Sequence, residues 1–175
     1  MQHLELEKTY LAKYLPSNLI KCDFIRISDI YIPVNREHPE LRVRSSNDKY
    51  EITKKIPLDK NDFSKQTEHT VFLDKEEYMA LITVSGKKVE KTRYYYIFQG
   101  RTAEIDVFEG SLSGLVLVDF EFETIEELEQ FRVPNFCLVD VTQEEFTAGG
   151  KLCGKTYNDI ESELRKFSYT KLKIK

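Results

Sequence analysis

The chain has 175 residues, of which 41% are apolar and 12% aromatic, enough apolar material for one domain with a sizeable core. Charged residues make up 32% of the sequence, yet the formal net charge is only -4. A protein that holds nucleic acid by bulk electrostatics would normally be basic, so this balance argues against a nucleic-acid partner. We therefore expect a single domain over residues 1–175.

Cysteine usage and hydropathy argue against further classes of protein. Cys22, Cys137 and Cys153 are far apart and form no CxxC pair, which argues against a structural zinc site or a disulfide framework. The first residues are charged, and no apolar run approaches the length of a membrane span. We expect no secretory signal, no membrane association and a cytoplasmic location.

Strand-like segments dominate the chain from its first residues onward. They alternate apolar and polar residues and are rich in β-branched and aromatic side chains. Strands are expected at 3–11, 22–34, 40–46, 48–56, 68–73, 88–100, 101–110 and 114–123. Eight strands with few helices favour a mainly β fold, a closed eight-stranded antiparallel barrel or else a sandwich, over a parallel sheet.

Helical signals are fewer than strand signals. Asp74 is a candidate N-cap, and Thr124 with Glu127 three residues later forms a candidate capping box. Helices are expected at 73–85, 124–131, 142–149 and 156–167. The polar stretch 57–67 between two expected strands is predicted to be a loop.

Charged residues are sorted by sign on alternate positions of successive strands. The pairs on one face are Glu5 and Glu7, Arg42 and Arg44, Lys91 and Arg93, Glu104 and Asp106, and Asp119 and Glu121. Like charges two positions apart gain little as surface decoration, and solvent faces usually mix polar residue types. Repeated pairs of one sign therefore favour cationic strands that face anionic strands across a shared cavity.

A cavity lined by both signs of charge suits a phosphate chain together with a divalent metal ion. Lysine and arginine match the negative charge of phosphates, and arginine can do so with two hydrogen bonds at once. Mg²⁺ and Mn²⁺ prefer carboxylate oxygens and keep open positions for water. These two groups together are the requirements of metal-assisted phosphoryl transfer.

These segments resemble the motifs of the CYTH domains of the triphosphate tunnel metalloenzymes, from about residue 3 to about residue 152. "ELEKTYL" resembles the acidic first strand with its ExExK motif, "LRVR" the paired-arginine strand, "EITKK" the lysine strand and "VEKTRYYY" the EKxR strand. "AEIDVFEGSLSGLVLVDFEFE" is the longest match, with two acidic strands around a glycine-containing turn. The resemblance implies an eight-stranded tunnel that binds a small triphosphate with Mg²⁺ or Mn²⁺.

The resemblance also implies a role for each residue. The metal would be held by Glu5, Glu7, Asp119 and Glu121. The triphosphate would be bound by Arg42, Arg44, Lys54, Lys91 and Arg93. Outside these motifs, "GGKLCGK" is expected to end a helix near the tunnel mouth, which would bring Lys151 within reach of substrate. The implied catalytic set is Glu5, Glu7, Lys54, Arg93, Glu104 and Asp106. The implied mechanism is in-line attack by a metal-activated water on the terminal phosphoryl group.

Two positions depart from the family pattern. The lysine of ExExK falls on Thr9, which removes one charged phosphate contact, and Lys8 has the wrong strand parity to replace it. In "KQTEHTVF", where relatives carry an alternating pair of acids, Thr67 and His69 are expected to point inward with Glu68 between them.

Three functions stay open at the level of sequence. The first is hydrolysis of inorganic triphosphate or another small triphosphate. The second is an adenylate cyclase on the same scaffold. The third, motivated by Thr9, is a non-catalytic binder of nucleotides or polyphosphate. A small triphosphate is the partner that these motifs require, and a homodimer is left open.

Overall fold

The computed structural model describes the backbone of residues 2–59 and 62–174 and the side chains of residues 6–59 and 62–174. The strands are β1 (Gln2–Ala12), β2 (Phe24–Ile32), β3 (Leu41–Ser46), β4 (Lys49–Asp59), β5 (Asp62–Leu73), β6 (Lys87–Phe98), β7 (Arg101–Phe108), β8 (Val116–Phe122) and β9 (Cys137–Asp140). The α-helices are α1 (Lys75–Leu81), α2 (Ile125–Gln130), α3 (Gly149–Leu152) and α4 (Tyr157–Lys166). Short 3₁₀ turns are η1 (Leu19–Lys21), η2 (Gly110–Leu112) and η3 (Glu145–Thr147).

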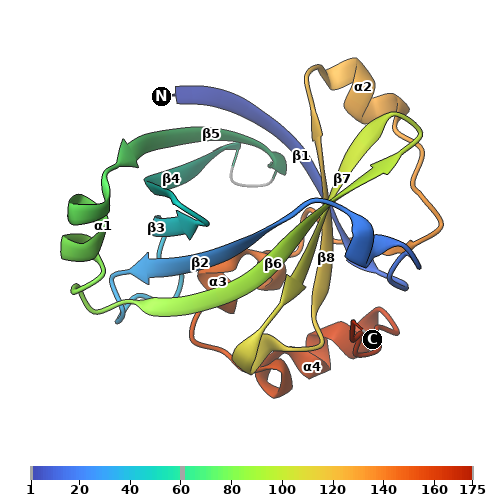
Figure 1. Cartoon of the computed structure of the whole chain (residues 1–175). Helices are drawn as coiled ribbons and strands as arrows, with labels where there is room; N and C mark the ends of the chain where they lie inside the picture. The colour runs from blue at the N-terminus through green and yellow to red at the C-terminus, as the bar shows by residue number, and fades with distance from the viewer. Residues whose placement is uncertain (1, 60–61, 175) are drawn as a thin grey trace.

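Strands β1 to β8 form a closed antiparallel barrel, which confirms the predicted fold class (Figure 1). The strand order is β5-β4-β3-β2-β6-β7-β8-β1, and the ring closes where β1 pairs with β5. β1 serves both of its neighbours by dividing its length, since residues 2–6 pair with β5 and residues 6–11 pair with β8. The sandwich alternative is therefore wrong.

The predicted loop at 57–67 is also wrong. β4 runs on to Asp59 and β5 begins at Asp62, and Ile56 and Pro57 pair with Thr67 and Gln66. Three of its described side chains, Pro57, Phe63 and Gln66, line the cavity in the barrel lumen. A polar composition therefore wrongly predicted a loop where two strands continue.

The short strand β9 was not predicted. It pairs with the end of β1, where Tyr10 lies opposite Asp140 and Leu11 opposite Val139. Four residues are too few for a period-two pattern to be recognised in the sequence. β9 adds a ninth strand beside β1, outside the closed ring.

The predicted N-cap forms at α1, and one of the two hydrogen bonds of the predicted capping box forms at α2. The Asp74 carboxylate accepts from the Glu77 amide at 2.8 Å, and the Glu77 carboxylate accepts from the Asp74 amide at 2.8 Å. The Thr124 hydroxyl likewise accepts from the Glu127 amide at 3.2 Å. The Glu127 carboxylate, however, accepts from the Glu123 amide, so the reciprocal bond of a capping box is replaced there.

The helix predicted at 142–149 is wrong, because this segment contains only η3 before α3 begins at Gly149. The helix predicted at 156–167 is confirmed as α4, which begins after Thr156 and buries Tyr157, Ile160 and Leu164. No α-helix in the described part of the chain is both long and apolar enough to cross a membrane.

Two apolar cores pack against the barrel wall, and the first of them also contributes Val89, Phe108 and Leu117 to the lining of the cavity. One core joins α4 to an end of the barrel through Ile160 and Leu164, together with Leu115. The other covers the outside of β1, β7 and β8, where Tyr10 and Phe120 pack edge to face. Figure 1 shows α4 beneath the barrel and α2 at the opposite end. Burial on the outside of β1, β7 and β8 directs the alternate residues of these strands inward.

Candidate active site in the barrel lumen

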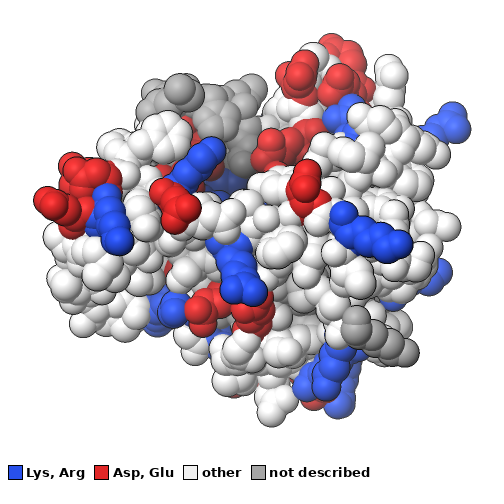
Figure 2. Space-filling view, viewed as in Figure 1, with Lys and Arg blue, Asp and Glu red and all other residues white. Residues whose placement is uncertain are grey.

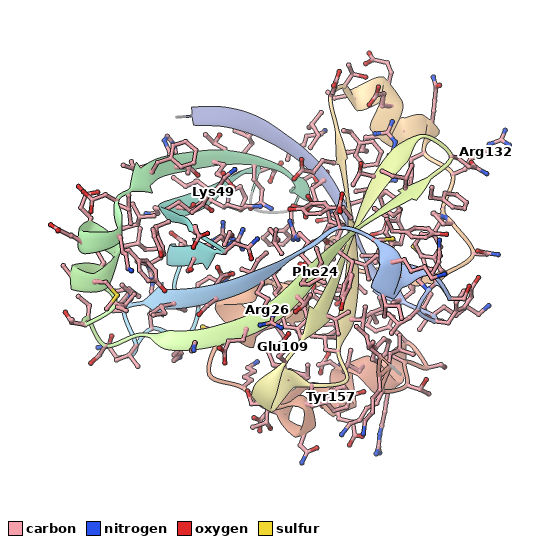
Figure 3. All side chains as sticks on the ribbon, in the orientation of Figure 1. Phe24, Arg26, Lys49, Glu109, Arg132 and Tyr157 are labelled. Atoms are coloured by element: carbon pink, nitrogen blue, oxygen red, sulfur yellow. The ribbon has the colours of Figure 1, made fainter. Side chains whose placement is uncertain are left out.

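A cavity of about 730 Å³ occupies the barrel lumen. Alternate residues of all eight barrel strands line it, namely Glu7, Thr9, Asp29, Tyr31, Arg42, Arg44, Glu51, Thr53, Lys55, Gln66, Glu68, Lys91, Arg93, Asp106, Asp119 and Glu121. Among the described residues of its lining, ten are Asp or Glu and five are Lys or Arg. Figure 3 shows nitrogen and oxygen side-chain ends gathered between β4 and β2.

Asp29 fixes one arginine of β3 in the lumen. The Arg44 guanidinium donates to both oxygens of Asp29, at 2.7 and 2.8 Å, a bidentate pair. Burial alone would raise the pKa of Asp29, but the charges of Arg44 and Arg42 outweigh it and bring that pKa to about 2. Arg44 is therefore a fixed positive charge.

Arg42 is held more loosely than Arg44. Its nearest carboxylate contacts, to Asp29 and Glu51, are both 3.9 Å long. Its Nε is buried and has no hydrogen-bond partner in the part of the chain that the structure describes. A buried donor of this kind is costly to leave unsatisfied, so Arg42 is well suited to bind an anion in the lumen.

Asp106 organises two more cations in the middle of the lumen. It accepts two hydrogen bonds of 2.7 Å from Arg93 and another from Lys91. Burial would raise the pKa of Asp106, but Arg93 and Lys91 lower it well below its ordinary range. Arg93 also contacts Glu104 and lies 3.3 Å from an oxygen of Asp119.

Beside these cations lies an acidic wall on β7, β8 and β1, which consists of Glu7, Glu104, Asp119 and Glu121. The β1–β8 register sets Glu7 opposite Glu121, and the β7–β8 register sets Glu104 opposite Asp119. Burial, followed by the negative charges of Glu7 and Asp106, raises the pKa of Asp119 well above its ordinary value. Asp119 Oδ1 is buried and lacks a hydrogen-bond partner among the described residues.

A second hollow of about 530 Å³ adjoins the acidic wall near α2. Glu104 lines this hollow rather than the main cavity, whereas Glu121 lines both. Burial is the chief cause that raises the pKa of Glu104. On the face seen in Figure 2, acidic side chains gather over α2 and over α1.

Most of the residues predicted to form the site lie together in the lumen. The main cavity is lined by Glu7, Arg42, Arg44, Lys91, Arg93, Asp106, Asp119 and Glu121, and Glu104 contacts Arg93 beside it. The side chain of Glu5 falls outside the described residues. Its backbone lies in β1 opposite Gln66. The roles assigned to these residues stay predictions.

The prediction for Lys54 is wrong in its placement, and the lysine of β4 that faces the lumen is Lys55. Lys54 is 46% exposed and lies 3.5 Å from Glu40, whereas Lys55 lies 3.6 Å from Glu7 and 3.8 Å from Glu68. Lys54 does share a face with Ile52, as predicted, but that face is the outside of the barrel.

The same one-residue error affects β5. Glu68 lines the cavity, in register with Lys55, whereas His69 is exposed and lies opposite Lys54. The Glu68 carboxylate accepts from the Thr70 hydroxyl at 2.7 Å. The segment thus supplies an inward acid, and neither His69 nor Thr67 lines the lumen.

Lys151 lies at one end of the cavity without lining it. Its Nζ is 3.1 Å from Glu37 and 3.4 Å from Glu145. The preceding Gly149 and Gly150 do line the cavity, so α3 borders this end.

Sequence reasoning missed the carboxylates that hold the β3 arginines. Asp29 and Glu51 occupy lumen positions on β2 and β4 and contact Arg44 or Arg42. The sequence does contain a pattern that could have indicated Asp29. In "RISDIYI" this acid interrupts an apolar face that continues to Tyr31. Tyr31 and Thr142 also line the lumen and were not predicted.

The acidic wall fits a divalent cation by the chemistry of its donors. It offers hard carboxylate oxygens, one of which, Asp119 Oδ1, is unpartnered and buried. In the described part of the chain, no three His, Cys, Asp or Glu side chains lie close enough together to hold an ion by themselves. Mg²⁺ commonly takes one or two carboxylates and completes its shell with water and substrate phosphates.

Comparisons with known proteins agree with this geometry. No protein-family profile matches the chain. An inorganic triphosphatase from Nitrosomonas europaea is 29% identical over 143 residues, which cover 81% of this chain and 91% of that protein. The crystal structure of an inorganic triphosphatase superposes with a TM-score of 0.61 at 27% identity, covering 85% of this chain and 93% of its own.

A more distant solved structure is similar to this chain in fold only. A Bacillus halodurans protein described as an adenylate cyclase has a TM-score of 0.53 at 13% identity, with 99% of this chain and 95% of that chain covered.

Proposed function

We propose that this chain, which belongs to the CYTH family of triphosphate tunnel proteins, hydrolyses a small triphosphate in its barrel lumen with a divalent metal ion. The observation that carries the proposal is a closed lumen in which five cations and ten carboxylates line one cavity, counted over the described residues. The likeness to an inorganic triphosphatase supports inorganic triphosphate as the substrate to test first.

The five lumen cations, Arg42, Arg44, Lys55, Lys91 and Arg93, would bind the phosphate oxygens. Arg42 has an unsatisfied donor, so binding an anion would remove a cost rather than break an existing bond. Arg44 is already oriented by Asp29 and can present its remaining N–H groups to a phosphate.

Asp106 would act as a positioning residue. By accepting from both Lys91 and Arg93, it fixes the two side chains in place before substrate arrives. Cations fixed in advance stabilise the charge of a transferring phosphoryl group without reorganising during the reaction.

The metal would be Mg²⁺ or Mn²⁺, bound through one or two carboxylates among Glu7, Asp119 and Glu121 and completed by water and substrate phosphates, with Glu5 as a further predicted ligand. When bound, such an ion neutralises phosphate charge and lowers the pKa of a water molecule. The need for it follows from the lining, because carboxylates outnumber cations among the described residues and a triphosphate adds further negative charge.

The test is a panel of inorganic triphosphate, ATP and other nucleoside triphosphates, each with Mg²⁺ or Mn²⁺, with all products resolved. Release of orthophosphate is expected. Failure to release phosphate from any of them with either metal would refute hydrolysis. Cyclic AMP with diphosphate would instead identify a cyclase, and tight binding without turnover a binding module.

A matched pair of arginine variants tests whether the lumen is the site. Arg42→Ala is expected to lose activity because it removes a lumen cation. Arg132→Ala should retain it, since Arg132 is exposed and extends away from the barrel beside α2 (Figure 3). Equal loss in both variants would contradict a lumen site.

The whole chain as one tunnel domain, the cytoplasmic location and the homodimer stay predictions.

A further inference from the structure

Two buried threonines lie beside the lumen lysine of β4. Thr53 is 1% exposed and Thr70 is 7% exposed, and the two are in register across β4 and β5. The next pair on the same face is Lys55 with Glu68. Thr53 lines the cavity but Thr70 does not, so any effect of Thr70 on a substrate must pass through another residue.

The hydrogen bonds of these threonines run in one direction, toward Glu68. An ionised carboxylate can only accept, so the Thr70 hydroxyl donates its single hydrogen to Glu68 Oε1, at 2.7 Å. The two hydroxyl oxygens are 3.1 Å apart, and their contact must then use the hydrogen of Thr53. Consecutive hydrogen bonds polarise one another, and a bond that ends on a charged group is stronger than a neutral one. The two hydroxyls therefore fix the Glu68 carboxylate.

Glu68 turns different oxygens toward Thr70 and Lys55. Oε1 accepts from Thr70, and Oε2 lies 3.8 Å from Lys55 Nζ. The same Nζ lies 3.6 Å from Glu7, so the ammonium group is between a carboxylate of β5 and one of β1. Lysine carries its charge on a flexible four-carbon stem, so the position of this charge depends on where the carboxylates are held.

Arginines of the lumen are fixed without such a chain of hydroxyls. Arg44 makes two hydrogen bonds to the carboxylate of Asp29. Arg93 does the same with Asp106. Two parallel bonds set the plane of a guanidinium, whereas an ammonium group has no plane to match. Lys55 therefore depends more than these arginines on a second layer of residues.

We propose that Thr70 is a positioning residue: through Glu68 it holds the Lys55 ammonium group where it can bind a phosphate oxygen of the substrate. Thr53 supports this role by donating to the Thr70 hydroxyl. The inference rests on the proposed function, because it gives Lys55 a phosphate to bind, but it concerns binding of the phosphate and not its hydrolysis.

The test measures the affinity for imidotriphosphate with Mg²⁺ by titration calorimetry. This analogue has nitrogen in place of the bridging oxygens and is not hydrolysed. Thr70→Val removes the hydroxyl and keeps the branched shape of the side chain. It is expected to bind the analogue about fivefold more weakly than the parent, the equivalent of one ordinary hydrogen bond. Thr70→Ser restores a hydroxyl and should recover most of the affinity.

Thr92→Val is the matched control. Thr92 is also 7% exposed and donates to a glutamate, Glu109, at 2.5 Å, but this pair lies away from the cavity lining. It should keep the parent's affinity. In a Lys55→Ala background, Thr70→Val should cause no further loss, since the two residues act on one contact.

Three results would overturn the inference. They are parent-like affinity in Thr70→Val, an equal loss in Thr92→Val, and a Thr70→Ser variant that binds as weakly as Thr70→Val. If Thr70→Val does not fold, Thr70→Ala removes the hydroxyl without adding bulk. It should weaken binding to a similar extent, and parent-like affinity would again overturn the inference.

The proposed function fails separately, because hydrolysis is measured with inorganic triphosphate and binding with the analogue. Absence of hydrolysis with the affinity differences intact refutes catalysis alone. Hydrolysis together with parent-like affinity in the Thr70 variants refutes only the role of Thr70.

Discussion

Two adjacent lysines on β4 occupy opposite sides of the barrel wall. Lys55 reaches Glu7 and Glu68 in the lumen, whereas Lys54 is half exposed beside Glu40. Because the two residues are identical and consecutive, replacing each in turn is a matched experiment that tests which of them faces the lumen.

Lys55→Ala is expected to lower kcat/KM on the order of a hundredfold, because a charged phosphate contact is worth about 2–3 kcal/mol. Lys54→Ala should stay within about twofold of the parent, as for other surface changes. Steady-state kinetics with inorganic triphosphate measures both. The reverse ranking would show that Lys54, not Lys55, faces the substrate.

The pair between Asp29 and Arg44 predicts a loss of stability that depends on pH. Asp29→Asn is expected to lower the free energy of unfolding by about 3 kcal/mol at neutral pH, because it leaves a buried guanidinium without its counter-ion. The exposed Asp48→Asn is the control and should change it by less than about 0.5 kcal/mol.

The sign of the pH effect follows from the lowered pKa of Asp29. Its folded-state pKa of about 2 lies below its ordinary value, so the pair stabilises the fold above that ordinary value. This contribution is lost as the pH falls toward 2. Urea unfolding of parent and Asp29→Asn should therefore converge in acid, and a constant difference would contradict the assignment.

At the scale of elements, α3 packs against the loop before β3 because Gly150 carries no side chain. A Cβ added at Gly150 would lie 2.4 Å from the Pro39 carbonyl oxygen and 2.5 Å from the His38 ring. A backbone carbonyl cannot move aside as the end of a flexible side chain can. The position of α3 at the cavity end thus depends on the absence of a side chain there.

Gly150→Ala is expected to destabilise the protein by about 2 kcal/mol, the usual cost of overpacking a tight contact. It should also lower kcat/KM, because α3 borders the cavity. Thermal unfolding and kinetics measure the two effects. Lys151→Ala on the same helix loses only ion pairs near the surface and should cost less than about 1 kcal/mol. Parent-like unfolding of Gly150→Ala would show that α3 can shift without cost.

At the scale of the whole molecule, the lumen concentrates carboxylates inside a barrel whose wall is stabilised from outside. Among the described residues, the lining carries twice as many acids as bases. Mutual repulsion of these acids opposes folding, and a divalent ion bound in the lumen would relieve it.

Mg²⁺ or Mn²⁺ is therefore expected to raise the unfolding temperature more than KCl at matched ionic strength. Monovalent salt screens exposed charges well and buried charges poorly. Differential scanning fluorimetry with both salts checks this, with EDTA as the reference. Equal shifts from both salts would mean that no ion binds specifically in the lumen.

The sequence by itself determined that the fold is mainly β and which kinds of charge share a cavity, whereas the pairing of β1 with β5 decided that the sheet closes into a barrel. Alternation is a local property of each strand, and it placed Arg42 with Arg44 and Lys91 with Arg93 on common faces. The acidic strands showed the same sorting, so a two-signed cavity could be predicted without any tertiary contact.

Only the tertiary structure decided which face of an ambiguous strand turns inward. Lys54 and Lys55 fit either parity, as do Glu68 and His69, and a shift of one residue reverses a whole strand. The pairing of Lys55 with Glu68 resolves both choices together. The same applies to the acidic wall, where Glu104 lies opposite Asp119, because partners across a sheet are set by register and not by distance along the chain.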